Sequence, residues 1–172
     1  MSYAINRAWS DQFLPEIRRI VGPHLLVPSP LEVDREQAAD LIVLRARDMA
    51  VAARVRRCGY ADEYPYDVYF TVRSRLDNGC KTEMAKLMEG WGDWMFYGHA
   101  GLAPGSVDRW WLIDLHLWRE RLLREGFAQG WKHLAKQQSN GDGTHFLAFD
   151  LRAFKPSILI AGSHGVPLAE AV

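Results

Sequence analysis

"DVYFTVRSRLDNGCKTEMAKLMEGWGDWMFYGH", residues 67–99, decides the fold of this chain. It opens with an alternating β-type run, passes through a polar turn and a short helical repeat, and closes with a second apolar run. The pattern predicts strands at 67–75 and 93–100, with one helix between them. Because a helix that joins two strands usually crosses over the sheet, we expect residues 93–100 to run parallel to an earlier strand.

The intervening helix is marked at both ends. Thr82 is a typical N-cap, and Gly90 or Gly92 is a typical stop. Between them apolar residues recur at i, i+3, i+4 and i+7, starting from Met84. One face of this helix should therefore pack on the sheet.

The same patterns extend outward along the 172 residues. They predict helices at 11–21, 115–126 and 127–139, and strands at 40–44, 49–57, 110–114, 144–151 and 157–162. We expect 40–44, 49–57 and 67–75 to form a three-strand antiparallel meander in a central mixed sheet with flanking helices. The fold class is α+β, or mixed α/β, and the length suits a single domain over residues 1–172.

The composition restricts the classes of partner. Lys and Arg together number 21, as do Asp and Glu, so the formal charge is zero and any electrostatic site must be local. Cys58 and Cys80 lack the spacing of a zinc site, and no apolar run reaches the roughly 20 residues of a membrane helix. We expect a cytoplasmic protein without membrane association. The sequence also lacks the HExxH, G-x-S-x-G and phosphate-loop motifs.

A local positive surface is the clearest binding signal. Seven arginines, at 45, 47, 54, 56, 57, 73 and 75, share their window with only four carboxylates. Period-two alternation places Arg54 and Arg56 on one face of the second strand, and Arg73 and Arg75 on one face of the third. Since guanidinium groups match phosphate oxygens, we expect a nucleic-acid partner, bound by Arg54, Arg56, Arg75 and Lys86. The alternative is a solvated sheet face whose arginines pair with nearby carboxylates.

Two carboxylates near this surface are candidate metal ligands. Asp40 begins the first strand of the meander, and Glu83 lies in the first turn of the following helix. Mg²⁺ is commonly held by one or two carboxylates together with substrate phosphates, so the pair suits Mg²⁺ or Mn²⁺. Glu83 alone is also explained as an acid that complements the helix dipole.

The order helix, three strands, helix, strand, with "FTVRS" at 70–74 as the third strand, resembles the PD-(D/E)XK nuclease superfamily and its restriction-endonuclease-like fold. The resemblance implies metal-dependent cleavage of a nucleic-acid phosphodiester, with Asp40 as the strand acid, Arg73 at the position of the family's lysine, and Glu83 as the second carboxylate. Thr71 stands where the family usually has an acid. In general character the chain also resembles small phage proteins.

Whether the chain is an enzyme stays open at this stage. Two alternatives to a nuclease remain: a non-catalytic module that binds nucleic acid or protein on the same fold, and an assembly protein. The second half of the chain is rich in Trp, which is typical of protein interfaces, so self-association is a further expectation.

Overall fold

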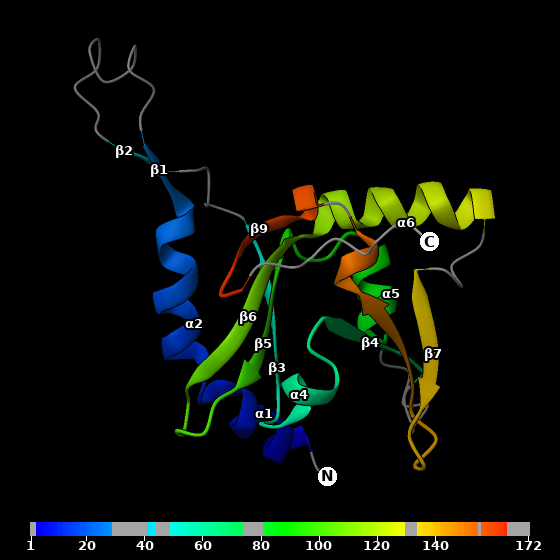
Figure 1. The fold of residues 1–172 in the computed structure, drawn as a ribbon, viewed down its shortest axis with the longest axis horizontal. Helices are drawn as coiled ribbons and strands as arrows, with labels where there is room; N and C mark the ends of the chain where they lie inside the picture. Colours follow the sequence, from blue (N-terminus) through cyan, green and yellow to red (C-terminus); the bar gives the residue numbers. More distant parts are fainter. Residues whose placement is uncertain are drawn as a thin grey trace.

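The computed structural model describes residues 3–28, 41–43, 49–73, 81–129, 134–154 and 156–164 (Figure 1). Its α-helices are α1 (Tyr3–Asp11), α2 (Leu14–Val21), α4 (Tyr60–Glu63), α5 (Glu83–Met88) and α6 (Leu115–Gln129). Its strands are β1 (Leu26–Pro28), β2 (Leu41–Val43), β3 (Val51–Arg56), β4 (Asp67–Arg73), β5 (Trp94–Ala100), β6 (Val107–Asp114), β7 (Ala135–Ser139), β8 (His145–Asp150) and β9 (Leu159–Gly162). The content is α+β, as predicted.

A four-stranded mixed sheet forms the centre, in the order β3-β5-β6-β9. β3 and β5 are parallel, and the other two pairs are antiparallel. The parallel pair confirms that the segment containing α5 crosses over between an earlier strand and 93–100. All seven residues of β5 are buried, which is expected for a strand covered on both faces.

A second, antiparallel sheet has the order β4-β8-β7. A turn at "NGDG" joins β7 to β8, and Gly143 adopts φ 84°, a left-handed conformation that favours glycine. The predicted meander therefore differs from the structure: β2 pairs with β1, β3 with β5, and β4 with β8. Sequence neighbours are often but not always sheet neighbours, and here β3 and β4 pair with strands from later in the chain.

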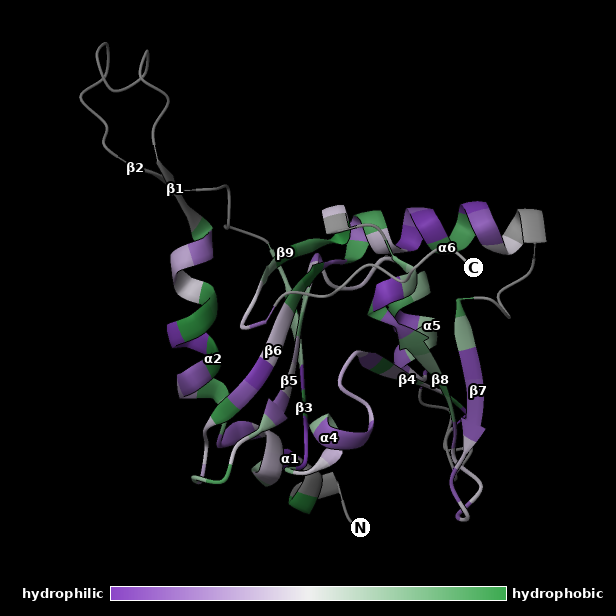
Figure 2. Cartoon of the chain, in the orientation of Figure 1, coloured by the Kyte–Doolittle hydropathy of each residue, from purple (hydrophilic) through white to green (hydrophobic). Residues whose placement is uncertain are grey.

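The core has two parts, on either side of the four-stranded sheet. On one side α2 packs against Phe96 and Leu112, and on the other Tyr97 and Trp111 belong to the cluster shared with the three-stranded sheet and α6. Figure 2 shows β7, at the outer edge of that second sheet, as largely hydrophilic. Polar residues suit an edge strand that has one neighbour.

The helices agree with local signals in the sequence. Thr82 caps α5, since its Oγ1 accepts a hydrogen bond from the Ala85 N–H at 3.4 Å. The predicted helix at 11–21 is interrupted, with α1 ending at Asp11 and α2 beginning beside Pro15. The prediction of a helix over 127–139 is wrong for 135–139, because those residues pair with β8. No helix in the described ranges is both long and apolar enough to cross a bilayer.

His99 on β5 is a buried polar residue with a consequence for stability. Its side chain is 2% exposed, and neither ring nitrogen has a hydrogen-bond partner among the described residues. Its register neighbours across the sheet are Arg56 on β3 and Arg109 on β6. Burial, helped by these two cations, lowers the pKa of His99 to about 4.

We predict that this histidine makes folding sensitive to acid. In the unfolded chain this histidine binds a proton below its pKa of about 6.5, whereas in the folded chain it binds one only near pH 4. Protonation between these pH values therefore favours the unfolded chain, and stability falls as the pH falls from about 6.5 to about 4. Urea titrations at the two ends of the window should show that His99→Phe loses about 2 kcal/mol less than the wild type, after allowance for screening. Equal losses in the two proteins would contradict the assignment.

Candidate functional site

Glu83 joins the two sheets at their facing edges. β3 and β4 are each the terminal strand of their sheet in the described structure. The Glu83 carboxylate, at the start of α5, forms an ion pair with Arg54 on β3 and accepts a hydrogen bond from the Thr71 N–H on β4 at 3.1 Å. We call this junction the seam. One carboxylate thus satisfies a cation of one sheet and a backbone donor of the other.

A second contact across the seam involves Arg56. Its guanidinium carbon lies 4.3 Å from the centre of the Tyr60 ring on α4 and 4.4 Å from that of Tyr69 on β4. Two such contacts hold the guanidinium in place without neutralising its charge. Among the described residues, no carboxylate forms an ion pair with Arg56.

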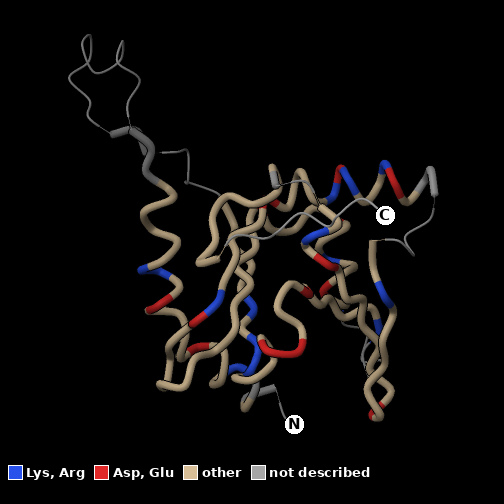
Figure 3. The backbone as a smooth tube through the Cα atoms, viewed as in Figure 1, with Lys and Arg blue, Asp and Glu red and all other residues tan. Residues whose placement is uncertain are grey.

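A cleft of about 290 Å³ opens at the seam. We call it the arginine cleft, and its lining residues are Trp9, Arg54, Val55, Arg56, Arg57, Tyr60, Thr71, Asn140, Thr144 and Phe146. Three of them are arginines and three carry aromatic rings, and among the residues that the structure describes no Asp or Glu lines the cleft. In Figure 3 the basic segments of β3 and its end lie beside the acidic α4. The cleft is therefore a local cationic site on a neutral chain.

The predicted binding residues divide between inside and outside this cleft. Arg54 and Arg56 line it, as expected from their shared face of β3. Arg73, at the end of β4, is exposed, and Lys86 lines a different groove beside α5. Arg75 lies outside the described residues. The two sheets meet at an edge instead of forming one meander, so the arginines of β3 and β4 do not make one continuous row.

Of the predicted metal ligands Asp40 and Glu83, the structure describes Glu83. Asp40 lies outside the described residues, so the pairing with Glu83 stays a prediction. Glu83 Oε2 already accepts hydrogen bonds from Arg54 and Thr71. Within the described ranges, no group of three or more His, Cys, Asp or Glu side chains is placed to hold a metal ion. The contacts of Glu83 fit an ion pair better than a metal ligand.

Several residues of the cleft were missed by sequence reasoning. Trp9 comes from α1, Tyr60 from α4, and Asn140 from the turn before β8. These residues are far apart in the sequence. Asn140 reaches the cleft because β8 pairs with β4, a long-range contact that no local pattern reveals. The one available signal was the run of three arginines at 54, 56 and 57, close in sequence to Tyr60.

A second cavity, of about 340 Å³, lies against the three-stranded sheet. Asp67 and Asp150 face each other in the β4–β8 register, and Tyr69 donates a hydrogen bond to Asp67 at 3.2 Å. Burial, together with the charge of Asp150, raises the pKa of Asp67. Despite its own burial, Asp150 has a lowered pKa because Arg152 hydrogen-bonds its carboxylate. Lys136 also lines this cavity, so it has mixed charge, unlike the arginine cleft.

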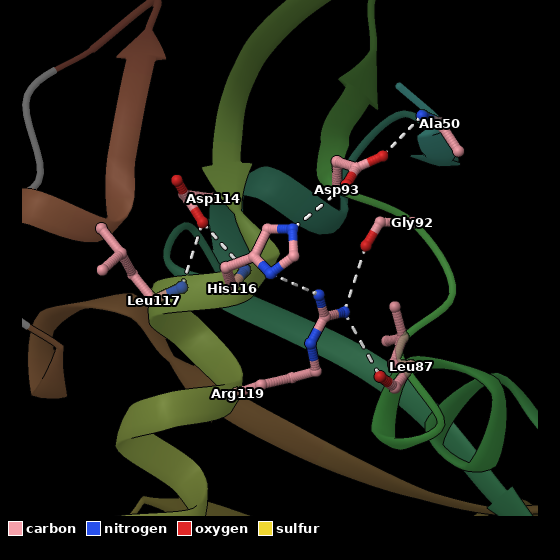
Figure 4. Close-up of polar contacts among 8 residues, drawn as sticks. All are labelled: Ala50, Leu87, Gly92, Asp93, Asp114, His116, Leu117 and Arg119. Atoms are coloured by element: carbon pink, nitrogen blue, oxygen red, sulfur yellow. Dashed lines mark hydrogen bonds and ion pairs between the residues drawn. The ribbon is translucent and has the colours of Figure 1, made fainter. Parts of the chain in front are cut away.

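A polar network fixes the loop between α5 and β5 (Figure 4). Arg119, 8% exposed on α6, donates to the carbonyl oxygens of Leu87 at 3.3 Å and Gly92 at 3.1 Å, and it lies 3.3 Å from His116 Nδ1. Because arginine can only donate, Nδ1 is the acceptor and the proton of neutral His116 is on Nε2, 3.1 Å from the Asp93 carboxylate.

The far end of this network holds β3. The other oxygen of Asp93 accepts a hydrogen bond from the Ala50 N–H at 2.8 Å. That bond, followed by the one from His116, lowers the pKa of Asp93. Asp114 caps the start of α6 by accepting from the N–H groups of His116 and Leu117. The contacts of the network hold backbone groups of β3, of the α5–β5 loop and of α6, which gives it a structural role.

We predict that Arg119 is the member on which stability depends. Arg119→Met keeps the apolar stem but leaves two carbonyl oxygens without their donor, which should lower the free energy of unfolding by about 2 kcal/mol or more. Arg124→Met is the matched control, since Arg124 is exposed and paired only with Glu120 in the described structure, and it should cost less than about 0.5 kcal/mol. Urea denaturation measures both, and equal losses would refute the assignment.

Comparison with known proteins gives no relative: no family model, curated protein or solved structure matches the chain.

Proposed function

We propose that the protein binds single-stranded nucleic acid in the arginine cleft. The observation that carries this proposal is the described lining of the cleft, in which Arg54, Arg56 and Arg57 occur with aromatic rings and no described Asp or Glu is present. Guanidinium groups bind phosphate oxygens through paired N–H donors, and aromatic rings stack on bases of any sequence. The two kinds of side chain are those that a nucleotide requires.

The charge in the cleft is available to a ligand to different degrees. Arg56 contacts two tyrosine rings and forms no ion pair with a carboxylate that the structure describes, so its charge is not neutralised there. Arg54 is partly neutralised by Glu83, so a phosphate must compete with that carboxylate. Arg57 is exposed, with its guanidinium 5.8 Å from the Trp9 ring. Arg56 should therefore contribute most to the binding of phosphate.

The size of the cleft favours a single strand. Its volume of about 290 Å³ lies just below the usual range of roughly 300–1,000 Å³ for ligand sites. Such a space admits one unstacked nucleotide, whereas the bases of a duplex are not free to enter it. Tyr60, which is 41% exposed, offers a ring at the entrance on which a base can stack.

Binding of a short labelled oligothymidylate, followed by fluorescence anisotropy, tests the proposal. With three phosphate contacts, the logarithm of the association constant should fall with the logarithm of salt concentration with a slope of about −2, or roughly −0.7 per contact. Arg56→Gln should weaken binding and reduce the magnitude of the slope by about 0.7.

Arg18→Gln is the matched control for that variant. Arg18 is exposed on α2 and does not line the cleft, yet its replacement removes the same charge. It should leave affinity and slope nearly unchanged. A folded protein that does not bind at low salt, or equal losses in the two variants, would contradict the proposal.

Metal-dependent cleavage of the bound strand remains a separate prediction, and one variant distinguishes it from binding alone. Glu83→Gln keeps an acceptor for the Thr71 N–H but removes the charge that competes for Arg54. If Glu83 only holds the seam, the variant should bind oligothymidylate about threefold to tenfold more tightly in the absence of metal. If Glu83 is a metal ligand, the wild type should cleave the bound strand with Mn²⁺ and the variant should not, although both still bind it.

A further inference from the structure

Trp91 is presented to solvent by a loop that has little freedom. The residue is 68% exposed, whereas Trp94, Trp111 and Trp118 are buried in the core. Gly90 and Gly92, on either side, have φ values of 95° and 78°, which favour glycine. The N–H groups of Gly90 and Trp91 bond back to the carbonyl oxygens of Leu87 and Lys86, both at 3.1 Å, which is the Schellman end of a helix.

The network around Arg119 holds this loop from behind. Arg119 binds the carbonyl oxygens of Leu87 and Gly92, the residues that precede and follow the turn (Figure 4). A buried cation and two left-handed glycines thus fix the backbone of a residue whose own side chain is mostly in water. A large ring held rigidly at the surface loses little entropy when it is buried by a partner.

An apolar groove of about 240 Å³ lies directly beside this ring. Trp91 forms its rim, and the apolar lining comes from β3, β4, β5 and α5: Val51, Ala52, Ala53, Phe70, Leu87 and Met95. The same face therefore carries a protruding apolar side chain and an adjacent apolar hollow. A two-fold interface buries the same surface on both copies, so this surface must contain both the protruding side chain and the groove that receives it. Trp91 and the adjacent groove meet this requirement.

The charges of the face are also self-complementary. Lys86 lines the groove and has no ion pair among the described residues. Glu89, two residues before Trp91, is exposed and bound only to the exposed Lys81 in the described structure, a kind of pair that contributes little. If Trp91 enters the groove of a second copy, Glu89 accompanies it toward that copy's Lys86. The zero net charge of the chain adds no repulsion between copies.

We propose that this face is a two-fold docking surface for a second copy of the chain, in which Trp91 of each copy fills the groove beside α5 of the other. The inference is independent of the nucleic-acid proposal, because the groove and the arginine cleft have different rings and cations. Two tryptophan rings bury at most about 500 Å², and the grooves that receive them bury a similar area, so the total of roughly 1,000 Å² is below the usual 1,200–2,000 Å² of a stable interface. The dimer is therefore weak and reversible.

Sedimentation equilibrium over roughly 1–300 µM, the range suited to a small interface, tests this proposal. The weight-average mass of the wild type should rise from monomer toward dimer. Trp91→Ser should weaken the association by about 30-fold or more, as expected for a tryptophan at the centre of an interface. Leu102→Ser is the matched control, because Leu102 is 92% exposed in the β5–β6 connection, and it should associate like the wild type.

A charge exchange tests the orientation. Lys86→Glu should weaken the dimer, and the addition of Glu89→Lys should restore it, because the two positions face each other across the two-fold axis. A wild type that is monomeric over the whole range, or a Trp91→Ser variant that associates normally, would overturn the proposal. Failure of the double variant to restore association would overturn the two-fold arrangement.

Discussion

The carboxylate of Glu83 is the interaction on which the arrangement of this molecule depends. Two sheets meet at terminal strands, and an edge strand normally presents unsatisfied backbone groups. Glu83 satisfies one of them, the Thr71 N–H, and pairs with Arg54 of the other sheet. Since its position at the start of α5 is fixed by the Thr82 cap, a local helix signal determines where the sheets join. The arginine cleft opens at this seam.

The cleft also explains how a neutral chain obtains a cationic site. The two arginines of β3 differ in their described partners: Arg54 pairs with a carboxylate, whereas Arg56 contacts tyrosine rings. Contacts with rings fix a guanidinium without consuming its charge, so local potential is preserved. The polar network of Asp93, His116 and Arg119 acts on the other end of β3, where it holds Ala50 and the loop that carries Trp91.

Local chemistry was predictable from the sequence, and long-range pairing was not. The cap at Thr82, the stop at Gly90 and the shared face of Arg54 and Arg56 follow from residue type and period, and all three are present. The strand at 135–139 was missed because "AKQQS" has no apolar alternation and is a strand only through its neighbour β8. The sequence also places Glu83 near the arginines. Because the contact between the two sheets is long-range, the sequence alone did not distinguish an ion pair with Arg54 from a metal ligand.

The central claim is that Arg54, Arg56 and Arg57 together bind the phosphates of one bound strand. Side-chain ¹⁵N NMR of the arginine Nε–H groups, during titration with oligothymidylate, examines it residue by residue. The account predicts that the signals of these three arginines shift together and saturate at one ligand per chain, while those of Arg18 and Arg124 remain in place. Shifts confined to arginines outside the cleft, or no shift in a folded protein, would contradict it.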